Sequence, residues 1–170
     1  MTEGIVKRYE LDRTQLAITD VIQTNVSDTL TGADARAAAS DWIKNGFPNP
    51  ASVGKKSTEG GFKYPMIIID YSEVEMEQKV LDSSKHAIIH TVMIHCHSIN
   101  RSNNTISGRQ EANQLADACS YALMTTGKNQ LNINAKLHGP DIIGTDTDVE
   151  FNGGHKVYVT TITYRFTRFD

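Results

Sequence analysis

The residues best suited to chemistry lie in one short stretch, HTVMIHCHSI at positions 90–99, which holds three histidines and one cysteine. Imidazole and thiolate side chains are the usual ligands of zinc in proteins. A β-strand, however, points successive side chains to opposite faces of a sheet. His95 and His97 are then expected on one face and His90 and Cys96 on the other, so a regular strand excludes a compact site built from all four.

A site with two histidines remains open on the face of His95 and His97. If Glu73 lies opposite them on a neighbouring strand, its carboxylate supplies a third ligand, and the chain becomes a metal-dependent hydrolase. The simpler interpretation places both histidines beside a row of glutamates on a polar strand face, where cross-strand pairs give modest support. We favour this interpretation and expect no essential metal. His90 and Cys96 are expected to pack in a core or an interface.

Two further patterns lack the context that their chemistry requires. The loop GKKST at positions 54–58 has Asn49 where a phosphate-binding loop needs its first glycine, and no strand is expected before it. Ser107, His86 and an aspartate supply the residue types of a catalytic triad, but no strand-to-helix nucleophile elbow surrounds a serine. Neither pattern predicts catalysis.

The charged loops are not expected to bind a ligand either. Asp146, Asp148 and Glu150 resemble the start of a calcium loop, but its glycine and its distant glutamate are missing. The basic residues at 55–56 and 101–109 are scattered and are interpreted as solvated. The sequence therefore predicts no catalytic residue, no cofactor and no metal, and the chain is not expected to be an enzyme.

The totals describe an ordinary globular protein. The chain has 170 residues, a formal net charge of −3 and two cysteines, Cys96 and Cys119. This charge does not favour binding to a polyanion, and cysteines on expected apolar faces favour reduced thiols. The charged amino terminus lacks an apolar signal core, and no run approaches the length of a membrane span. A soluble, unexported protein is expected.

Hydrophobic periodicity predicts the main elements. Apolar residues recur every three or four positions over 13–31 and 108–125, which indicates two amphipathic helices, the second capped by Ser107 with Gln110. A second short helical stretch is expected within ADARAAASDWIKNGFPNP. The run YPMIIID indicates a buried strand, and the alternating segments on either side of LDSSK indicate a long antiparallel hairpin.

The last third of the chain is predicted to contain three more elements. QLNINAKL is interpreted as a strand, HGPDIIGTDTD as an irregular loop, and VEFNGGHKVYVTTITYRFTRF as a hairpin around an Asn-Gly turn. The expected architecture is α+β, with an antiparallel or mixed β-sheet, long hairpins and two main flanking helices. A single domain spanning residues 1–170 is expected, without a repeat or a linker.

The order of these elements resembles that of the tail terminator proteins of long-tailed bacteriophages and of related tail-completion and neck proteins. The resemblance is carried by a helix before the strand of FKYPMIIID, a long hairpin, the capped helix GRQEANQLADACSYAL, and the terminal strand VYVTTITYRF. It covers essentially the whole chain and rests on architecture. Trp42, the loop at 51–61 and the histidine-rich hairpin have no counterpart in it.

The resemblance implies a structural virion protein without a catalytic site. Members of this family form rings, usually hexameric, at the head-proximal end of the tail tube. The ring ends tube polymerisation and offers the head-tail joining surface to the connector or stopper, and DNA passes through its lumen without specific binding. The implied location is the virion neck, after assembly in the host cytoplasm and without a membrane. Another neck component, such as an adaptor, a stopper or a tail-completion protein, is the alternative.

The turn LDSSK is the candidate subunit interface. The alternating hairpin that carries this turn exceeds the usual strand length, so its far end is expected to reach a neighbouring subunit or the tube. The candidate interface residues are Leu81, Asp82, Ser83, Ser84 and Lys85.

Overall fold

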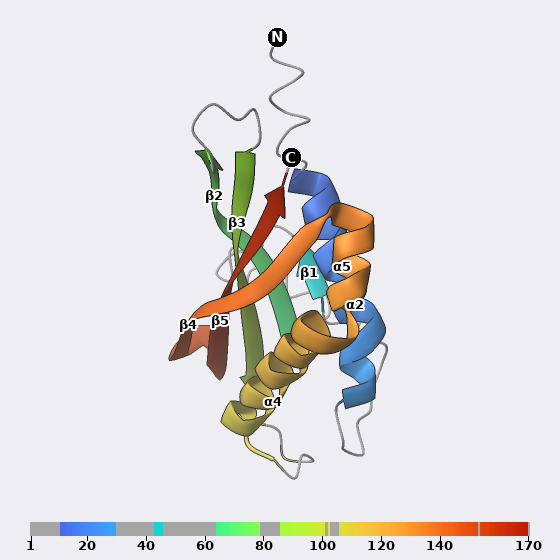
Figure 1. The fold of residues 1–170 in the computed structure, drawn as a ribbon. Coiled ribbons are helices and arrows are strands. Elements are labelled where there is room, and N and C mark those ends of the chain that lie inside the picture. Colours follow the sequence, from blue (N-terminus) through green and yellow to red (C-terminus); the bar gives the residue numbers. More distant parts are fainter. Residues whose placement is uncertain are drawn as a thin grey trace.

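In the described part of the chain, three helices lie on one face of a five-stranded sheet (Figure 1). The computed structural model describes residues 11–29, 43–45, 64–78, 86–100, 102, 106–152 and 154–169. The strands, in their order across the sheet, are β1 (Ile43–Asn45), β2 (Met66–Gln78), β3 (His86–Ile99), β5 (His155–Phe169) and β4 (Leu137–Asn152). Only the β1–β2 pair is parallel. The predicted α+β class with a mixed sheet is confirmed.

The first helix, α2 (Leu11–Thr29), matches the helix predicted over 13–31. Its buried face contains Ile18, Val21 and Ile22, which recur at the predicted spacing. A second helical stretch was expected after α2. This prediction is wrong for residues 43–45, which form β1 and pair with Ile67–Ile69 of β2. A partner strand that supplies backbone hydrogen bonds outweighs a weak local preference for helix.

Strands β2 and β3 form the predicted long hairpin pair. Their antiparallel register extends from Met66 opposite His97 to Gln78 opposite His86, with one irregularity between Tyr71 and Glu73. The buried segment and the alternating segment of the sequence are therefore one continuous strand of 13 residues. The irregularity separates the two patterns, because an extra residue shifts the alternation of side chains.

The second main helix is α4 (Gly108–Tyr121), which continues as a π-helical segment, η3 (Ala122–Thr126). The predicted capping box is present: the Ser107 hydroxyl accepts from the Gln110 N–H at 3.2 Å, and the Ser107 N–H donates to the Gln110 side chain at 3.0 Å. These reciprocal bonds satisfy two backbone donors that a helix start leaves unpaired. The helix predicted over 108–125 is confirmed.

The segment expected as a strand is instead a third helix, α5 (Lys128–Ala135). Leu131 and Ala135 are both buried and lie four residues apart, which places them on one face of this helix. The helix follows Gly127, where an added Cβ would lie 2.1 Å from a methyl carbon of Val21 in α2. The glycine thus allows the close approach of α5 and α2.

The segment at 138–148 that was expected as an irregular loop belongs to β4, a strand of 16 residues. Its register against β5 shifts between His138 and Asp141 and again between Ile142 and Gly144. These irregularities accommodate the glycines and the proline that resembled a loop. The hairpin to β5 turns one residue later than predicted, because Asn152 pairs with His155 and Gly154 has a φ of 81°.

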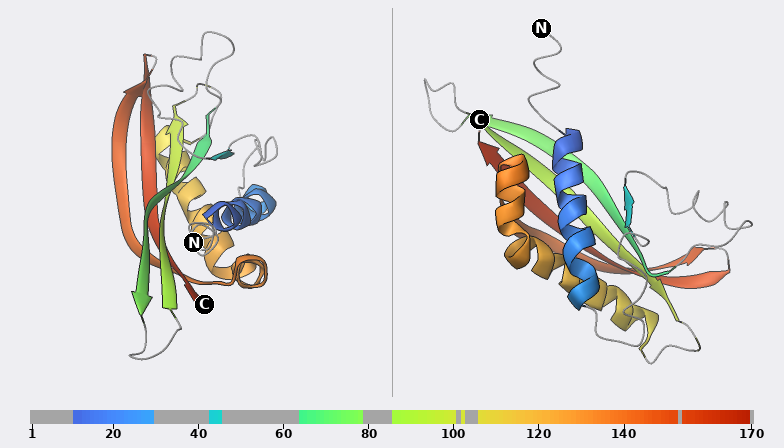
Figure 2. Two further views of the ribbon diagram at one scale, coloured as in Figure 1. Left: turned by 90° about the horizontal axis from the view of Figure 1, so that it is seen from above. Right: turned by 90° about the vertical axis from the view of Figure 1, so that its right-hand side faces the viewer.

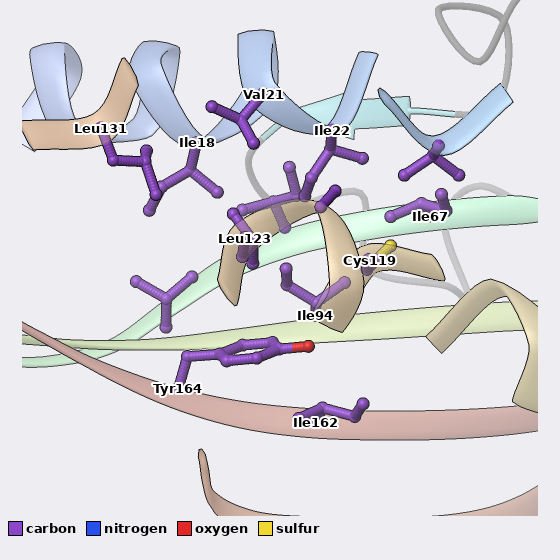
Figure 3. Close-up of a cluster of buried hydrophobic side chains, with 14 of the residues drawn as sticks. Ile18, Val21, Ile22, Ile67, Ile94, Cys119, Leu123, Leu131, Ile162 and Tyr164 are labelled. Carbon is purple, nitrogen blue, oxygen red and sulfur yellow. The ribbon is translucent and has the colours of Figure 1, made fainter. Parts of the chain in front are cut away.

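The hydrophobic core lies between the helices and one face of the sheet (Figures 2 and 3). It joins residues from every described helix and from the long strands, including Ile18 and Val21 of α2, Ile67 of β2, Ile94 of β3, Leu123 of η3, Leu131 of α5 and Tyr164 of β5. The sheet extends past the helices at two opposite ends, where the β2–β3 pair and the β4–β5 hairpin project (Figure 2).

Candidate functional site

The histidines of β3 divide between the two faces of the sheet, as predicted. His90 and Cys96 lie on the face covered by the helices, where both are fully buried and Cys96 belongs to the core. His95 and His97 have the opposite parity and point to the other face. A hydrogen bond with Cys119 and burial raise the pKa of the Cys96 thiol, which favours an inert packing role.

The surroundings of His97 correct the expectation of a polar strand face. His97 pairs with Met66 on one side and Val159 on the other, and only 3% of it is exposed. His95 is half-buried, and its Nδ1 lies 2.9 Å from Thr161 Oγ1. Around His97, this sheet face is therefore apolar and buried. Alternation in the sequence did not reveal this, because the apolar neighbours of His97 come from β2 and β5.

The strand register also argues against a three-ligand metal site. Glu73 pairs with Thr91, whereas His95 pairs with Ile68. Thr91 and His95 are separated by roughly 13 Å along β3, which is too far for shared coordination. Among the described residues, no group of three histidine, cysteine, aspartate or glutamate side chains is placed to hold a metal ion.

The electrostatics of the buried histidines do not suit proton transfer. Burial, followed by the neighbouring His95, lowers the pKa of His97 to about 4. Burial, followed by the Arg168 charge, lowers the pKa of His90 to about 4. Both imidazoles are therefore neutral at pH 7, and a base with such a low pKa is poorly matched to catalysis at that pH. Their role is packing within the sheet.

The acidic residues that resembled a calcium loop form a different feature. Asp146, Asp148 and Glu150 pair with Thr161, Val159 and Val157 in the regular part of β4. Alternate residues of an extended strand share one face and cannot wrap around an ion as a loop does. They belong to the outermost strand of the sheet, and residues 141–148 are all exposed. We call residues 145–150 of β4 the open edge.

One arginine that was interpreted as solvated instead fastens the open edge to α4. Arg109 donates to the backbone carbonyl of Val159 at 3.0 Å and to that of Asp148 at 2.8 Å. Its guanidinium also lies 5.1 Å from the ring centroid of Tyr158. The arginine thus joins both strands of the β4–β5 hairpin to the start of the helix. No local pattern could reveal this role, because Arg109 and Val159 are 50 residues apart in the sequence.

The candidate interface at 81–85 lies outside the described residues, and it stays a prediction. The pairing of the strands that carry it is described as far as Gln78 opposite His86. At this end of the sheet, β3 also pairs with β5 as far as Ala87 opposite Phe169, and 52% of Phe169 is exposed. The Phe169 ring meets His138 edge-on at 5.3 Å. The exposed aromatic ring is therefore near the end predicted to contact another subunit.

No protein-family model matches this sequence, and no curated protein sequence is significantly similar to it. None of the helices in the described part of the chain combines the length and the apolarity that a bilayer span needs.

Proposed function

We propose that this chain is a structural protein of a long-tailed bacteriophage that forms a hexameric ring at the head-proximal end of the tail tube. The ring ends tube polymerisation and provides the head-tail joining surface for the connector or stopper. The observation that carries the proposal is a sheet with all the described helices on one face, whose hairpins project beyond these helices at two opposite ends (Figure 2). Helix α2, the β2–β3 pair, the capped helix α4 and the terminal strand β5 follow one another in the order of the segments that carry the resemblance to tail terminators.

The length of the strands supports a role in assembly. The four long strands have 13, 14, 16 and 15 residues, whereas five or six residues are usual in globular proteins. Strand ends that project beyond the core can contact a neighbouring subunit at little cost to the core. A head-to-tail contact of this kind, repeated with a rotation that closes, produces a ring.

The charge of the chain is consistent with a ring through which DNA slides. The formal net charge is −3, and the open edge contains three acidic residues and no basic one. Phosphate contacts by lysine and arginine supply most non-specific affinity for DNA. A protein that offers few such contacts does not retain the passing genome. In this proposal the protein acts in the virion neck, after assembly in the host cytoplasm.

The hydrolase alternative finds no support in the register, since Glu73 and His95 are held apart on neighbouring strands. Elemental analysis of the purified protein separates the two functions. The ring proposal predicts no stoichiometric metal and an unchanged melting temperature in the presence of a chelator. Stoichiometric zinc that survives purification, together with a lower melting temperature after chelation, would favour the hydrolase.

The deciding experiment removes this protein from the phage that encodes it. Overlong tails without heads are expected, and wild-type protein supplied in trans should restore normal tails. Normal-length tails that lack heads would indicate the alternative neck component instead. Normal-length tails still joined to heads would overturn the proposal. Electron microscopy of purified protein, alone and with tube ends, tests ring formation directly, and replacement of Leu81 and Lys85 together should weaken the ring more than it lowers subunit stability.

A further inference from the structure

The open edge pairs regularly with β5 on its inner side, and no described strand lies on its outer side. β4 is the last strand of the sheet, and among the described residues no strand lies on its outer side. From Thr145 opposite Ile162 to Asn152 opposite His155, its pairing with β5 contains no irregularity. The earlier part of β4 has two register shifts, which disrupt the straight edge that another strand would need. The region able to receive a strand is therefore the open edge.

Two backbone donors in the open edge are engaged by side chains. The Thr147 N–H donates to Asp146 Oδ1 at 2.9 Å, and the Val149 N–H donates to Asp148 Oδ1 at 2.7 Å. N–H groups two residues apart point to the same side of a strand. A backbone N–H that faced β5 would donate to a carbonyl group of β5. We therefore assign the N–H groups of Thr147 and Val149 to the outer side of β4. The carboxylates thus occupy the donors that an added strand would use.

The acidic side chains of the open edge lie on one side of the strand. Asp146, Asp148 and Glu150 occupy alternate positions. Burial raises the pKa of Glu150, and the charge of Asp148 adds to this shift. Arg109 and Lys156 lie over the ring of Tyr158, which pairs with Val149 and so belongs to the other face.

The charge pattern opposes pairing with a second copy of this chain. β1 pairs only with residues 67–69, so β2 continues beyond it at the other border of the sheet. That part of β2, DYSEVEMEQ at 70–78, contains four acidic residues and no basic one. Like charges placed directly opposite each other destabilise a strand pair. Neither β2 nor β4 of a second copy is therefore a suitable partner for the open edge.

We propose that the open edge binds, by strand addition, an extended segment of another protein that carries lysine or arginine at alternate positions. The basic side chains would pair with Asp146 and Asp148 and draw the carboxylates away from the backbone. The released N–H groups of Thr147 and Val149 then bond to carbonyl groups of the added strand. Between its basic residues the segment carries threonine or valine, which suits the face of Thr147 and Val149. This binding does not depend on the ring function.

The probe is a synthetic peptide with blocked ends, Thr-Lys-Val-Lys-Val-Lys-Thr, titrated into the full chain and followed by amide NMR. We expect the largest shifts at Thr147 and Val149. A matched peptide that is N-methylated along one edge keeps the charge and loses main-chain donors, and it should bind at least about tenfold more weakly. A peptide with glutamate in place of lysine should not bind.

Two variants and one matched control connect the binding to the open edge. Asp146→Asn with Asp148→Asn should weaken binding by roughly fivefold, as expected for the loss of two exposed charge pairs. Asp20→Asn with Asp117→Asn removes the same charge from exposed positions of α2 and α4 and should leave binding unchanged. Thr147→Pro should remain folded and lose binding, because proline is tolerated in a strand where the N–H faces outward.

Several results would overturn the proposal. Equal binding of a peptide with grouped lysines would show that charge alone attracts the peptide. Unchanged binding of the peptide by the Asp146→Asn, Asp148→Asn variant would show that these carboxylates do not attract the basic segment. Unfolding of the Thr147→Pro variant would place that N–H in the ladder with β5. Dimers of the unmodified chain, with Thr147 protected from hydrogen exchange, would make a second copy the occupant.

Discussion

The helix-covered face of β5 and the neighbouring strand β4 have very different surroundings. On the helix side, Tyr164 and Phe166 are fully buried among residues from all described helices. Beside β5, in contrast, β4 is exposed over residues 141–148, and 81% of Phe151 is exposed. Burial of apolar surface is the main favourable contribution to folding. The side chains on the helix-covered face therefore contribute most of the free energy of unfolding. Residues 141–148 of β4 contribute little to it.

Because of this difference, we expect one region of the sheet to determine folding stability and the other to determine binding. The covered face tolerates little change in side-chain volume, because protein interiors are packed to the density of organic crystals. The open edge has no such constraint and keeps polar backbone groups and charges at the surface. Substitutions on the covered face should change stability first, whereas substitutions on the open edge should change association first.

The largest effect is expected at Leu115, a fully buried residue of α4. Leu115→Asp places a carboxylate in the core without a partner, which should lower the free energy of unfolding by more than about 4 kcal/mol. The exposed neighbour Gln114 provides the control, because Gln114→Asp adds the same charge at the surface. Urea unfolding measures both variants. A natively folded Leu115→Asp protein of normal stability would contradict the assigned core.

The next effect is a loss of stability in acid. The pKa values of His90 and His97 are about 4 in the folded chain, below the ordinary value of 6.5. Between these values the unfolded state binds more protons than the folded state, so stability should fall as the pH decreases from 6.5 to 4. His97→Gln should flatten this dependence, measured as urea midpoints across the window. His155→Gln replaces an exposed histidine in the same way and is the control, and equal slopes for both variants would contradict the assignment.

A pair of glycines compares the two regions directly. At Gly127 an added methyl group would overlap a methyl carbon of Val21 at 2.1 Å, whereas at Gly144 in β4 the nearest atom lies 3.9 Å away. Gly127→Ala should therefore cost about 1–3 kcal/mol of stability through overpacking. Gly144→Ala should change stability by less than about 0.5 kcal/mol. Thermal melts measure both, and equal effects would show that the two regions are packed alike.

The sequence predicted those elements whose signals are local. Ser107 and Gln110 lie three residues apart, and their capping box specifies the start of α4 without help from the rest of the chain. The parity of His95 and Cys96 likewise follows from the strand itself. The faces of the histidines, the long β2–β3 pair and the two main helices were therefore predictable.

The errors arose where distant contacts decide the structure. α5 has weak helical periodicity, and it forms where Leu131 meets α2 and the core. β4 contains Gly139 and Pro140, which resemble a loop, yet β5 provides a partner that accommodates them through register shifts. The burial of His97 depends on Met66 and Val159. None of these partners is near in sequence, so no local pattern could reveal them.

The smallest effect on stability, and the clearest effect on association, is expected at Asp146 and Asp148. Charged residues at a sheet border prevent pairing with another sheet. Asp146→Val with Asp148→Val removes these charges and the bonds that hold the Thr147 and Val149 N–H groups. Valine also favours strands, so the melting temperature should change little. Sedimentation velocity should instead show dimers or larger species, because the freed donors can now pair with another β4. The charge-matched pair Asp20→Ala and Asp117→Ala should sediment as the unmodified chain does. If the double valine variant sediments as the unmodified chain does, these aspartates do not prevent the open edge from pairing with another strand.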